Sequence, residues 1–329
     1  MPEIIDSCGR KIDYFRISVT DRCNLRCVYC MPAGGISSSP RAEMLSFEEI
    51  ERVVRVAAAD GITRVRITGG EPLVRKHVEV LVKQLARIRA IQDIAMTTNG
   101  TLLKQHAGSL KAAGLNRINI SLDTLDPVRY RKITRMGSLD DVFDGMHAAV
   151  KAGFPPIKLN TLMLEGLGRR EIRSFLLLSL EHGVHVRFLE YMPVGNETFS
   201  FRNRAADARG TIMEEASAIG TYDEAQVYGN GTSVDYRFKG GKGTFGLVSP
   251  MTGKFCAKCN RLRLTSAGLI KICLHSNITF DLKARLRGGA SDGEISALIR
   301  EAVARKPASH ELDRQPINRS DFLMCQVGG

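Results

Sequence analysis

The chain has no tryptophan, few other aromatic residues and no long apolar run. Aromatic residues make up 6% of its 329 residues. The longest purely apolar stretches, such as Phe175 to Leu178, fall far short of the roughly 18 residues that a membrane-spanning helix needs. Charged residues between Glu3 and Asp13 interrupt the region where a signal peptide would lie. We therefore expect a cytoplasmic protein that does not enter a membrane.

Cysteine is also scarce, because eight residues are too few for a disulfide-stapled scaffold of this length. Six of them fall in two clusters, whereas Cys8 and Cys325 stand apart and are interpreted as ordinary buried or surface thiols. Hydrophobic residues at 43% and charged residues at 25% are typical of a globular protein, so wholesale disorder is excluded. The length suits one large domain or two ordinary ones.

Basic residues outnumber acidic residues in the chain. Lysine and arginine total 47 against 35 acidic residues, which gives a net charge of +12 and an isoelectric point near 9.5. This excess favours an anionic partner, which could be a nucleic acid, a nucleotide or a phosphorylated metabolite. Charge alone does not distinguish among them.

Short strand-like runs alternate with helical patterns from residue 14 to residue 192. The predicted strands are 14–19, 62–68, 93–98, 115–122, 157–163 and 184–191. Ser46 and Glu49 form the capping box of the first predicted helix, and Gly61 closes it. Such alternation predicts a parallel sheet with helices outside, either an incomplete (β/α)6 TIM-like barrel or a doubly wound sheet, since a closed barrel has eight units.

A polar stripe runs along one face of five predicted strands, while the other face stays mostly aliphatic. Its members are Arg16, Ser18, Arg64, Arg66, Thr68, Asn119, Ser121, Asp123, Lys158, Asn160, His185 and Arg187. One such strand could border bulk water, but five favour the polar lumen of an incomplete barrel. Few acidic residues share this face. We therefore expect its unpaired cations to bind a phosphate-bearing ligand.

The pattern changes after about residue 220 to glycine-rich, hairpin-like sequence. Residues 261–264 and 269–273 predict a hairpin, and Ser291 with Glu294 caps the last helix. We therefore divide the chain into a barrel, residues 1–220, and a carboxyl-terminal α+β region, residues 221–329, which ends in two glycines.

Cys23, Cys27 and Cys30 directly follow the first strand, at the end of the sheet where such folds place active sites. Three thiolates leave one coordination position without a protein ligand. This fits an iron-sulfur cluster with one uncapped iron better than structural zinc, although a zinc site remains an alternative. The C-x3-C-x2-C order, with Tyr29 before the last cysteine, resembles the radical S-adenosylmethionine superfamily. That resemblance implies a 4Fe-4S cluster whose open iron chelates S-adenosylmethionine.

Other polar residues stand at the ends of the later strands, as a site built from successive strands requires. The run Thr68-Gly-Gly-Glu-Pro72 resembles the superfamily's glycine-rich turn, so Gly70 is expected to meet the amino group of the cofactor. The pairs Asn160-Thr161 and Met192-Pro193 also follow strands. Without the resemblance, Met192 would be read equally well as a core residue.

A second set of thiols consists of Cys256, Cys259 and Cys273. His275 could complete it as a Cys3His zinc ribbon, and this alternative stays open. Arg261 and Arg263 follow at once on one strand face, however, and a structural zinc site does not need them. An anionic ligand bound at an open iron would need such cations beside it.

Nearly the whole chain resembles the GTP 3′,8-cyclase family of molybdenum-cofactor synthesis. The resemblance rests on the first cysteine loop with Met31-Pro32, on Arg66-x-Thr-Gly-Gly-Glu-Pro72, on Cys256-x2-Cys259-Asn-Arg-Leu-Arg263, on Cys273 and on the terminal glycines. It implies a second 4Fe-4S cluster that binds guanine. The implied GTP contacts are Arg16, Arg64, Arg66, Thr97, Lys158, Arg187, Arg261 and Arg263, with Gly328 and Gly329 entering the site. The implied S-adenosylmethionine contacts are Tyr29, Gly70, Ser121, Asn160 and Met192.

The resemblance also implies the reaction. The cofactor would be cleaved to a 5′-deoxyadenosyl radical that removes the 3′ hydrogen of GTP, and the C3′ radical would attack C8 of guanine. Arg16 would assist the reduction that yields 3′,8-cyclo-7,8-dihydro-GTP. An external one-electron reductant and a downstream cyclic pyranopterin monophosphate synthase are the implied partners, and a homodimer is one oligomeric state that the sequence allows. An added nitrogen donor at His275 could compete for the open iron of the second cluster.

Two other functions are compatible with parts of the sequence. A peptide-maturing radical enzyme with an auxiliary cluster would share both cysteine sets, but Arg261, Arg263 and the terminal glycines argue against it. A zinc-dependent nucleic-acid-binding module would explain the basic charge. The scarcity of aromatic residues and the alternating placement of the basic ones argue against that module, so no nucleic acid is expected as a partner.

Overall fold

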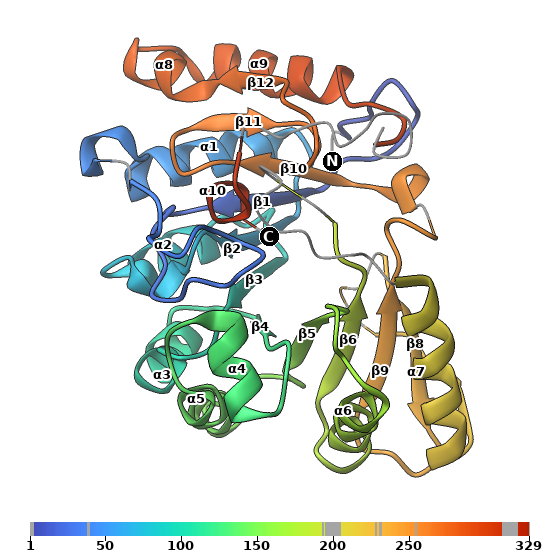
Figure 1. Ribbon diagram of the computed structural model, residues 1–329. Helices are drawn as coiled ribbons and strands as arrows, with labels where there is room; N and C mark the ends of the chain where they lie inside the picture. Colours follow the sequence, from blue (N-terminus) through green and yellow to red (C-terminus); the bar gives the residue numbers. More distant parts are fainter. Residues whose placement is uncertain are drawn as a thin grey trace.

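The computed structural model describes residues 3–37, 40–192, 194, 205–227, 229, 232–253, 255–310 and 322–328 (Figure 1). Its strands form one sheet of twelve, in the order β12-β11-β10-β1-β2-β3-β4-β5-β6-β9-β8-β7. They are β1 Tyr14–Ser18, β2 Arg64–Thr68, β3 Asp93–Thr98, β4 Arg117–Ser121, β5 Lys158–Leu162, β6 His185–Leu189, β7 Tyr222–Glu224, β8 Val234–Phe238, β9 Thr244–Val248, β10 Arg261–Leu264, β11 Leu269–Lys271 and β12 Thr279–Asp281. All six strands predicted between residues 14 and 192 are present.

The helices follow the strands in the predicted alternation. They are α1 Phe47–Ala59, α2 Val78–Ala86, α3 Leu103–Ala112, α4 Pro127–Thr134, α5 Leu139–Lys151, α6 Arg169–Glu181, α7 Ala205–Ile219, α8 Leu282–Arg287, α9 Asp292–Ala304 and α10 Met324–Val327, with short 3-10 helices η1 Arg41–Glu43, η2 Pro72–Val74 and η3 Phe255–Lys258. In the part of the chain that is described, no helix is long and apolar enough to cross a membrane.

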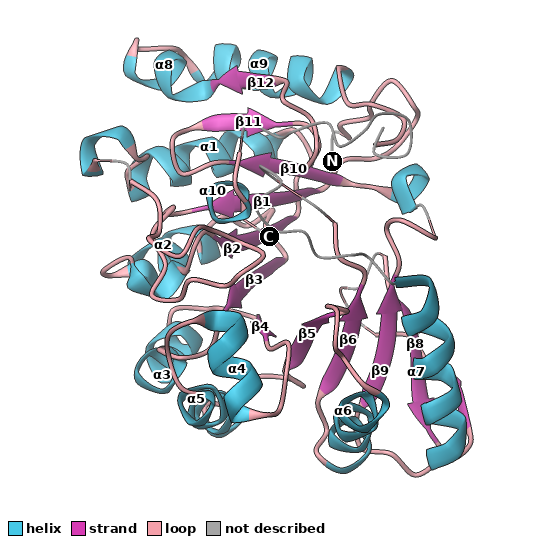
Figure 2. Ribbon diagram, in the orientation of Figure 1, coloured by secondary structure: helices cyan, strands magenta, loops and turns pink. Residues whose placement is uncertain are grey.

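The parallel strands β1 to β6 form an open, incomplete barrel, and the doubly wound alternative is set aside. The sheet bends through an arc, with α2, α3 and α5 on its outer side, and α10 is drawn over the end of β1 (Figure 2). On the outer face of the strands, Phe15, Val65 and Phe188 are fully buried beneath the helices. The ring of Phe188 packs edge-on against that of Phe175 in α6, with 6.1 Å between ring centroids. This apolar layer leaves the other face of the sheet for polar side chains.

Helix boundaries follow local signals in the sequence. Ser46 accepts a hydrogen bond from the Glu49 amide, the Glu49 side chain accepts one from the Ser46 amide, and Gly61 after α1 has φ +114°. Ser291 and Glu294 form the same capping box at α9. Both capping boxes were predicted.

The carboxyl-terminal region extends the barrel sheet at both edges. β10 pairs in parallel with β1 and antiparallel with β11, as the predicted hairpin requires, while β9 pairs in parallel with β6. The register sets Arg263 beside Arg16 and Arg261 beside Tyr14. Two arginines distant in sequence are thereby added to the inner face of the barrel.

Candidate active site

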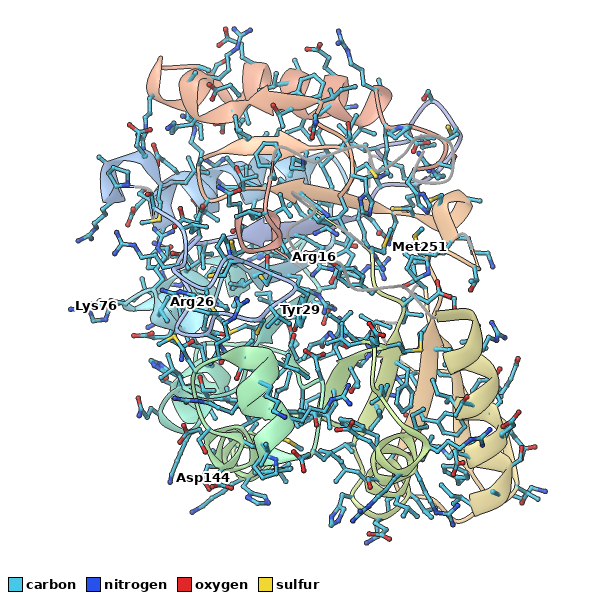
Figure 3. The ribbon with its side chains drawn as sticks, viewed as in Figure 1. Arg16, Arg26, Tyr29, Lys76, Asp144 and Met251 are labelled. Carbon is cyan, nitrogen blue, oxygen red and sulfur yellow. The ribbon has the colours of Figure 1, made fainter. Side chains whose placement is uncertain are left out.

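One cavity lies on the inner face of the barrel, where the predicted polar stripe meets the first cysteine loop. Its lining includes Arg16, Cys23, Cys27, Tyr29, Cys30, Arg64, Arg66, Gly70, Thr97, Ser121, Asp123, Asn160, Arg187, Met192, Arg261 and Arg263. Figure 3 shows Arg16 and Tyr29 near the middle of the molecule. The structure therefore gathers the predicted substrate-contacting and cofactor-contacting residues around a single space, with the exception of Lys158 and the terminal glycines.

Neutral groups hold two of the arginines in the cavity. Arg66 donates from Nε to the Tyr14 hydroxyl and from Nη1 to Thr97 Oγ1 at 3.3 Å, and Arg187 donates to Asn160 Oδ1 at 2.5 Å. The Asn119 side chain, with its amide oxygen turned toward the guanidinium groups, accepts from both arginines. These acceptors are neutral, and Asp235 also acts on Arg187 through its negative charge.

The cations also disfavour one another's charged states. Burial and then Arg263 hold the pKa of Arg16 well below its usual range. Burial, together with Arg187, Arg117 and Arg66, lowers the pKa of Lys158 to about 6. Keeping such charges together costs free energy that a bound polyanion would offset.

Arg64 and Lys158 do not lie as expected for unpaired cations that face a ligand. Arg64 was expected to be an unpaired cation, and this expectation is wrong, because its Nη2 forms an ion pair with Asp13, just before β1. Asp13 precedes the strand, so the alternation of side chains along the strand does not include it. Lys158 is 4% exposed and does not line the cavity. His185, also on the stripe, bonds to Thr244 and lies 3.4 Å from Asp235, so it belongs to the wall.

Cys23, Cys27 and Cys30 form no disulfide, and all three line the cavity. Arg26 fixes their loop by donating to the Cys23 carbonyl at 2.6 Å, and Nδ2 of the Asn99 side chain donates to Cys23 Sγ at 3.9 Å. Within the described residues, no three cysteine, histidine or carboxylate side chains converge as a single metal ion requires. Three thiols on one loop beside the cavity suit a cluster that leaves one iron open.

The glycine-rich turn after β2 packs directly against that loop. The amide of Gly70 donates to the Thr20 carbonyl and that of Glu71 to the Arg22 carbonyl, each at 2.8 Å. A Cβ on Gly70 would overlap the Arg22 backbone, so no larger residue fits there. Glu71, whose pKa burial raises to about 7, accepts from Thr98 Oγ1 at 2.8 Å and thereby ties the end of β2 to that of β3.

Asp123 is a site residue that sequence reasoning did not assign a role. The Tyr29 hydroxyl donates to its Oδ2 at 2.6 Å, and the Leu162 amide donates to its Oδ1 at 2.9 Å. Burial raises the pKa of Asp123 to about 6. The sequence signal for this role was its position two residues after Ser121, which puts both side chains on the polar face of the strand. The carboxyl orients Tyr29 over the cavity.

The second cysteine set lies at the edge of the same space. Cys256, Cys259 and Cys273 are free and partly exposed, and the adjacent Asn260 and Leu274 line the cavity although the three thiols do not. Burial opposes ionisation of Cys259, but Lys306 and the nearby arginines prevail and lower its pKa. Such cations suit the thiolate form that a metal centre needs.

His275 is buried beside this second set. Its Nε2 has no hydrogen-bond partner among the described residues, and its ring lies 6.0 Å from that of His310. Burial and then His310 lower the pKa of His275 to about 3, so the imidazole is neutral.

The end of the chain enters the cavity wall. The Gly328 carbonyl accepts from Arg263 Nη1 at 2.5 Å, its φ is +68°, and a Cβ there would overlap Thr68 Oγ1. Gly329 lies outside the described residues, as does Pro193. Cys325 of α10, interpreted from sequence as an ordinary thiol, is buried with its thiol hydrogen-bonded to that of Cys30. Nothing in its sequence spacing indicated that contact.

Two family models match the chain. The model of the Radical SAM superfamily matches residues 17–178, and that of Molybdenum Cofactor Synthesis C matches residues 184–312. A GTP 3′,8-cyclase from Pelotomaculum thermopropionicum is 46% identical over 325 residues, covering 98% of this chain and 99% of the relative. A GTP 3′,8-cyclase from Heliobacterium modesticaldum is 44% identical over 329 residues, covering 99% and 100%.

Solved structures agree with the fold. SuiB from Streptococcus suis, bound to S-adenosylmethionine, superposes with a TM-score of 0.63 at 15% identity, covering 96% of this chain and 77% of that one. At such low identity the likeness concerns the fold alone. It supports the open barrel together with its carboxyl-terminal extension.

Proposed function

This chain belongs to the GTP 3′,8-cyclase family of radical S-adenosylmethionine enzymes, and we propose that it acts as a lyase on GTP bound inside the barrel. The reaction converts GTP to 3′,8-cyclo-7,8-dihydro-GTP, the first step of molybdenum-cofactor biosynthesis. One observation carries the placement of the substrate. The inner face gathers several arginines around one cavity, beside a loop of three cysteines that form no disulfide.

The residues of the first loop fit the cofactor pair of this family. Cys23, Cys27 and Cys30 would hold a 4Fe-4S cluster, and Tyr29, Gly70, Ser121, Asn160 and Met192 would surround S-adenosylmethionine. When bound, this pair supplies the one-electron chemistry that opens a C–H bond of the substrate. The protein holds the ribose of GTP near that chemistry, and the buried walls exclude water.

The cations would hold the triphosphate and orient the nucleotide. Arg66 and Arg187, already fixed by Tyr14 and Asn160, present guanidinium groups at no further ordering cost. Arg16, Arg64, Thr97, Arg261 and Arg263 complete the proposed contacts. Lys158, behind the cavity wall, would add its charge once a bound triphosphate raises its lowered pKa. Arg16, paired in the sheet with both Arg66 and Arg263, is the proposed helper in the final reduction.

A second cluster at Cys256, Cys259 and Cys273 is part of the proposal. The neighbouring cations favour thiolates there, and Asn260 and Leu274 face the same cavity. His275 is neutral and stands beside this set, so it could meet the cluster or the guanine base without adding charge.

The proposal includes two partners outside the chain. An external one-electron reductant must supply the first cluster, and a cyclic pyranopterin monophosphate synthase would take the cyclised product.

The test is an anaerobic assay of the reconstituted protein with GTP, S-adenosylmethionine and dithionite. Chromatography should show 3′,8-cyclo-7,8-dihydro-GTP with the wild type and none with Cys27→Ser. Cys8→Ser changes an exposed thiol outside both sets and serves as the control. Failure of the loaded wild type to consume GTP would contradict the proposed function.

A further inference from the structure

A second large hollow lies outside the barrel cavity and shares no lining residue with it. It measures about 1100 Å³ and is formed by four segments: the end of β1, the stretch before α1, the stretch after β2 and the end of α8. Its lining includes Arg22, Arg41, Glu48, Arg75, Lys76, His77 and Arg287. Five of these are arginine or lysine against one carboxylate, so the hollow is strongly basic.

Arginine hydrogen bonds fix the four segments to one another. Arg75 donates to the carbonyls of Val19 at 2.6 Å and Leu45 at 2.7 Å, and its guanidinium stacks over Phe47 at 4.1 Å. Arg287 donates to the Ala42 carbonyl at 2.6 Å and pairs with Glu49. The hollow is thus a preformed surface whose floor is held by two arginines that already have partners.

Its rim carries the charge that a partner would meet. Arg41 and Lys76 are exposed, and the side chain of neither makes a hydrogen bond or ion pair within the described part of the chain. Lys76 extends outward at the periphery of the molecule (Figure 3). Cations spread around an open rim, instead of converging on one point, suit a protein surface better than a single phosphate group.

The hollow borders the first cysteine loop. Arg22 lines the hollow, and the next residue, Cys23, lines the barrel cavity. The Thr20 and Arg22 carbonyls also accept the hydrogen bonds of Gly70 and Glu71. A partner seated in the hollow would therefore touch the segment that leads directly to the proposed cluster ligands.

We propose that this basic hollow is the docking site of a small acidic one-electron carrier protein. The inference rests on the proposed function, because the first cluster needs an external electron. In the docked complex one electron leaves the carrier, which is oxidised, and reduces the cluster held by Cys23, Cys27 and Cys30. Complementary charge speeds such encounters and makes them sensitive to salt.

The test uses the holoenzyme, an acidic flavodoxin in its reduced form, and dithionite as the small reductant. Arg41→Glu with Lys76→Glu reverses the rim without removing an interaction of the fold. This double variant should lower the rate constant for cluster reduction by flavodoxin about tenfold or more and flatten its salt dependence, whereas reduction by dithionite should not change.

The matched control is Arg89→Glu with Lys151→Glu, which makes the same charge change at exposed positions near the amino ends of β3 and β5. It should behave as the wild type. An equal loss in this control, an equal loss with dithionite, or no loss with flavodoxin would overturn the proposal. So would a second equivalent of GTP bound by the wild type and lost in the rim variant, because the hollow would then be a nucleotide site.

Cluster reduction is followed optically without GTP, so its result does not depend on cyclisation. Absence of cyclic product in a dithionite-driven assay would instead count against the proposed function alone.

Discussion

At the scale of single residues, alternation along the strands was sufficient to place most of the cationic lumen. Arg16, Arg66 and Arg187 fall on one face because side chains alternate in any strand, and that rule needs no knowledge of the fold. The pairing of Arg64 with Asp13 escaped it, because Asp13 precedes the strand. The contact of Cys30 with Cys325 depends on how the chain end packs, which local sequence does not encode.

Lys158 gives a prediction about protons. Its pKa in the free protein is lowered to about 6, so near pH 7.5 the amine is mostly neutral. A bound triphosphate favours the charged form and raises that pKa, so GTP binding should take up a proton. Calorimetry in buffers of different ionisation enthalpy should show an uptake of about one proton with the wild type and clearly less with Lys158→Met. Equal uptake by the two proteins would exclude this role.

Arg263→Ala should weaken GTP binding. The guanidinium is buried, and losing a charge-assisted contact costs on the order of 1 to 3 kcal/mol. Cleavage of S-adenosylmethionine should persist as slow, uncoupled release of 5′-deoxyadenosine. Arg285→Ala, an exposed arginine on α8, is the control. Unchanged GTP affinity in a variant that keeps its full iron content would show that Arg263 serves only to hold the Gly328 carbonyl.

At the scale of elements, the helices and parallel strands could be predicted because their signals are local. Ser46 with Glu49 and Ser291 with Glu294 mark helix starts by themselves. The pairing of β10 with β1 and of β9 with β6 could not be predicted in this way. The first of these pairings sets Arg263 beside Arg16, although most of the chain lies between them in sequence. Neither strand carries a local signal that indicates which strand it pairs with.

The carboxyl-terminal tail supplies the prediction at this scale. Deleting Gly328 and Gly329 should leave the clusters and most GTP affinity intact but remove most cyclisation, because the tail closes the cavity wall between Arg263 and Thr68 and acts on positioning. Product formation and GTP affinity are measured together. A peptide ending in Gln-Val-Gly-Gly should restore part of the turnover.

A point substitution tests the same idea without shortening the chain. Gly328→Ala should also impair cyclisation, because φ is +68° there and a methyl group would overlap Thr68. Gly108→Ala, in α3 with open space around its Cβ, is the matched control. Cyclic product at the wild-type rate from the truncated enzyme would mean that the tail is a frayed end.

At the scale of the whole molecule, basic residues gather in two hollows, among other places. One group of cations faces the barrel cavity, and the other surrounds the outer hollow beside the first cysteine loop. The net charge of +12 predicted an anionic partner, but it could not separate a nucleotide inside from an acidic protein outside, because a sum carries no positions.

The metal content of the protein distinguishes an enzyme with two iron-sulfur clusters from a zinc protein. Two cubane clusters require about eight irons and eight sulfides per chain, and the brown protein should be sensitive to oxygen. Cys27→Ser should remove about half of the iron by disrupting the first set, and Cys259→Ser about half by disrupting the second, while Cys8→Ser should leave the content unchanged.

The second set is where the outcome matters most, because a Cys3His zinc ribbon at Cys256, Cys259, Cys273 and His275 was the sharpest alternative. A structural zinc has no need of Arg261 and Arg263, which line the cavity beside this set, so a cluster held by thiolates alone is expected. His275→Ala should therefore keep both clusters. Stoichiometric zinc with little iron after strictly anaerobic reconstitution, or loss of metal in His275→Ala, would instead establish the ribbon and remove the second iron centre from the mechanism.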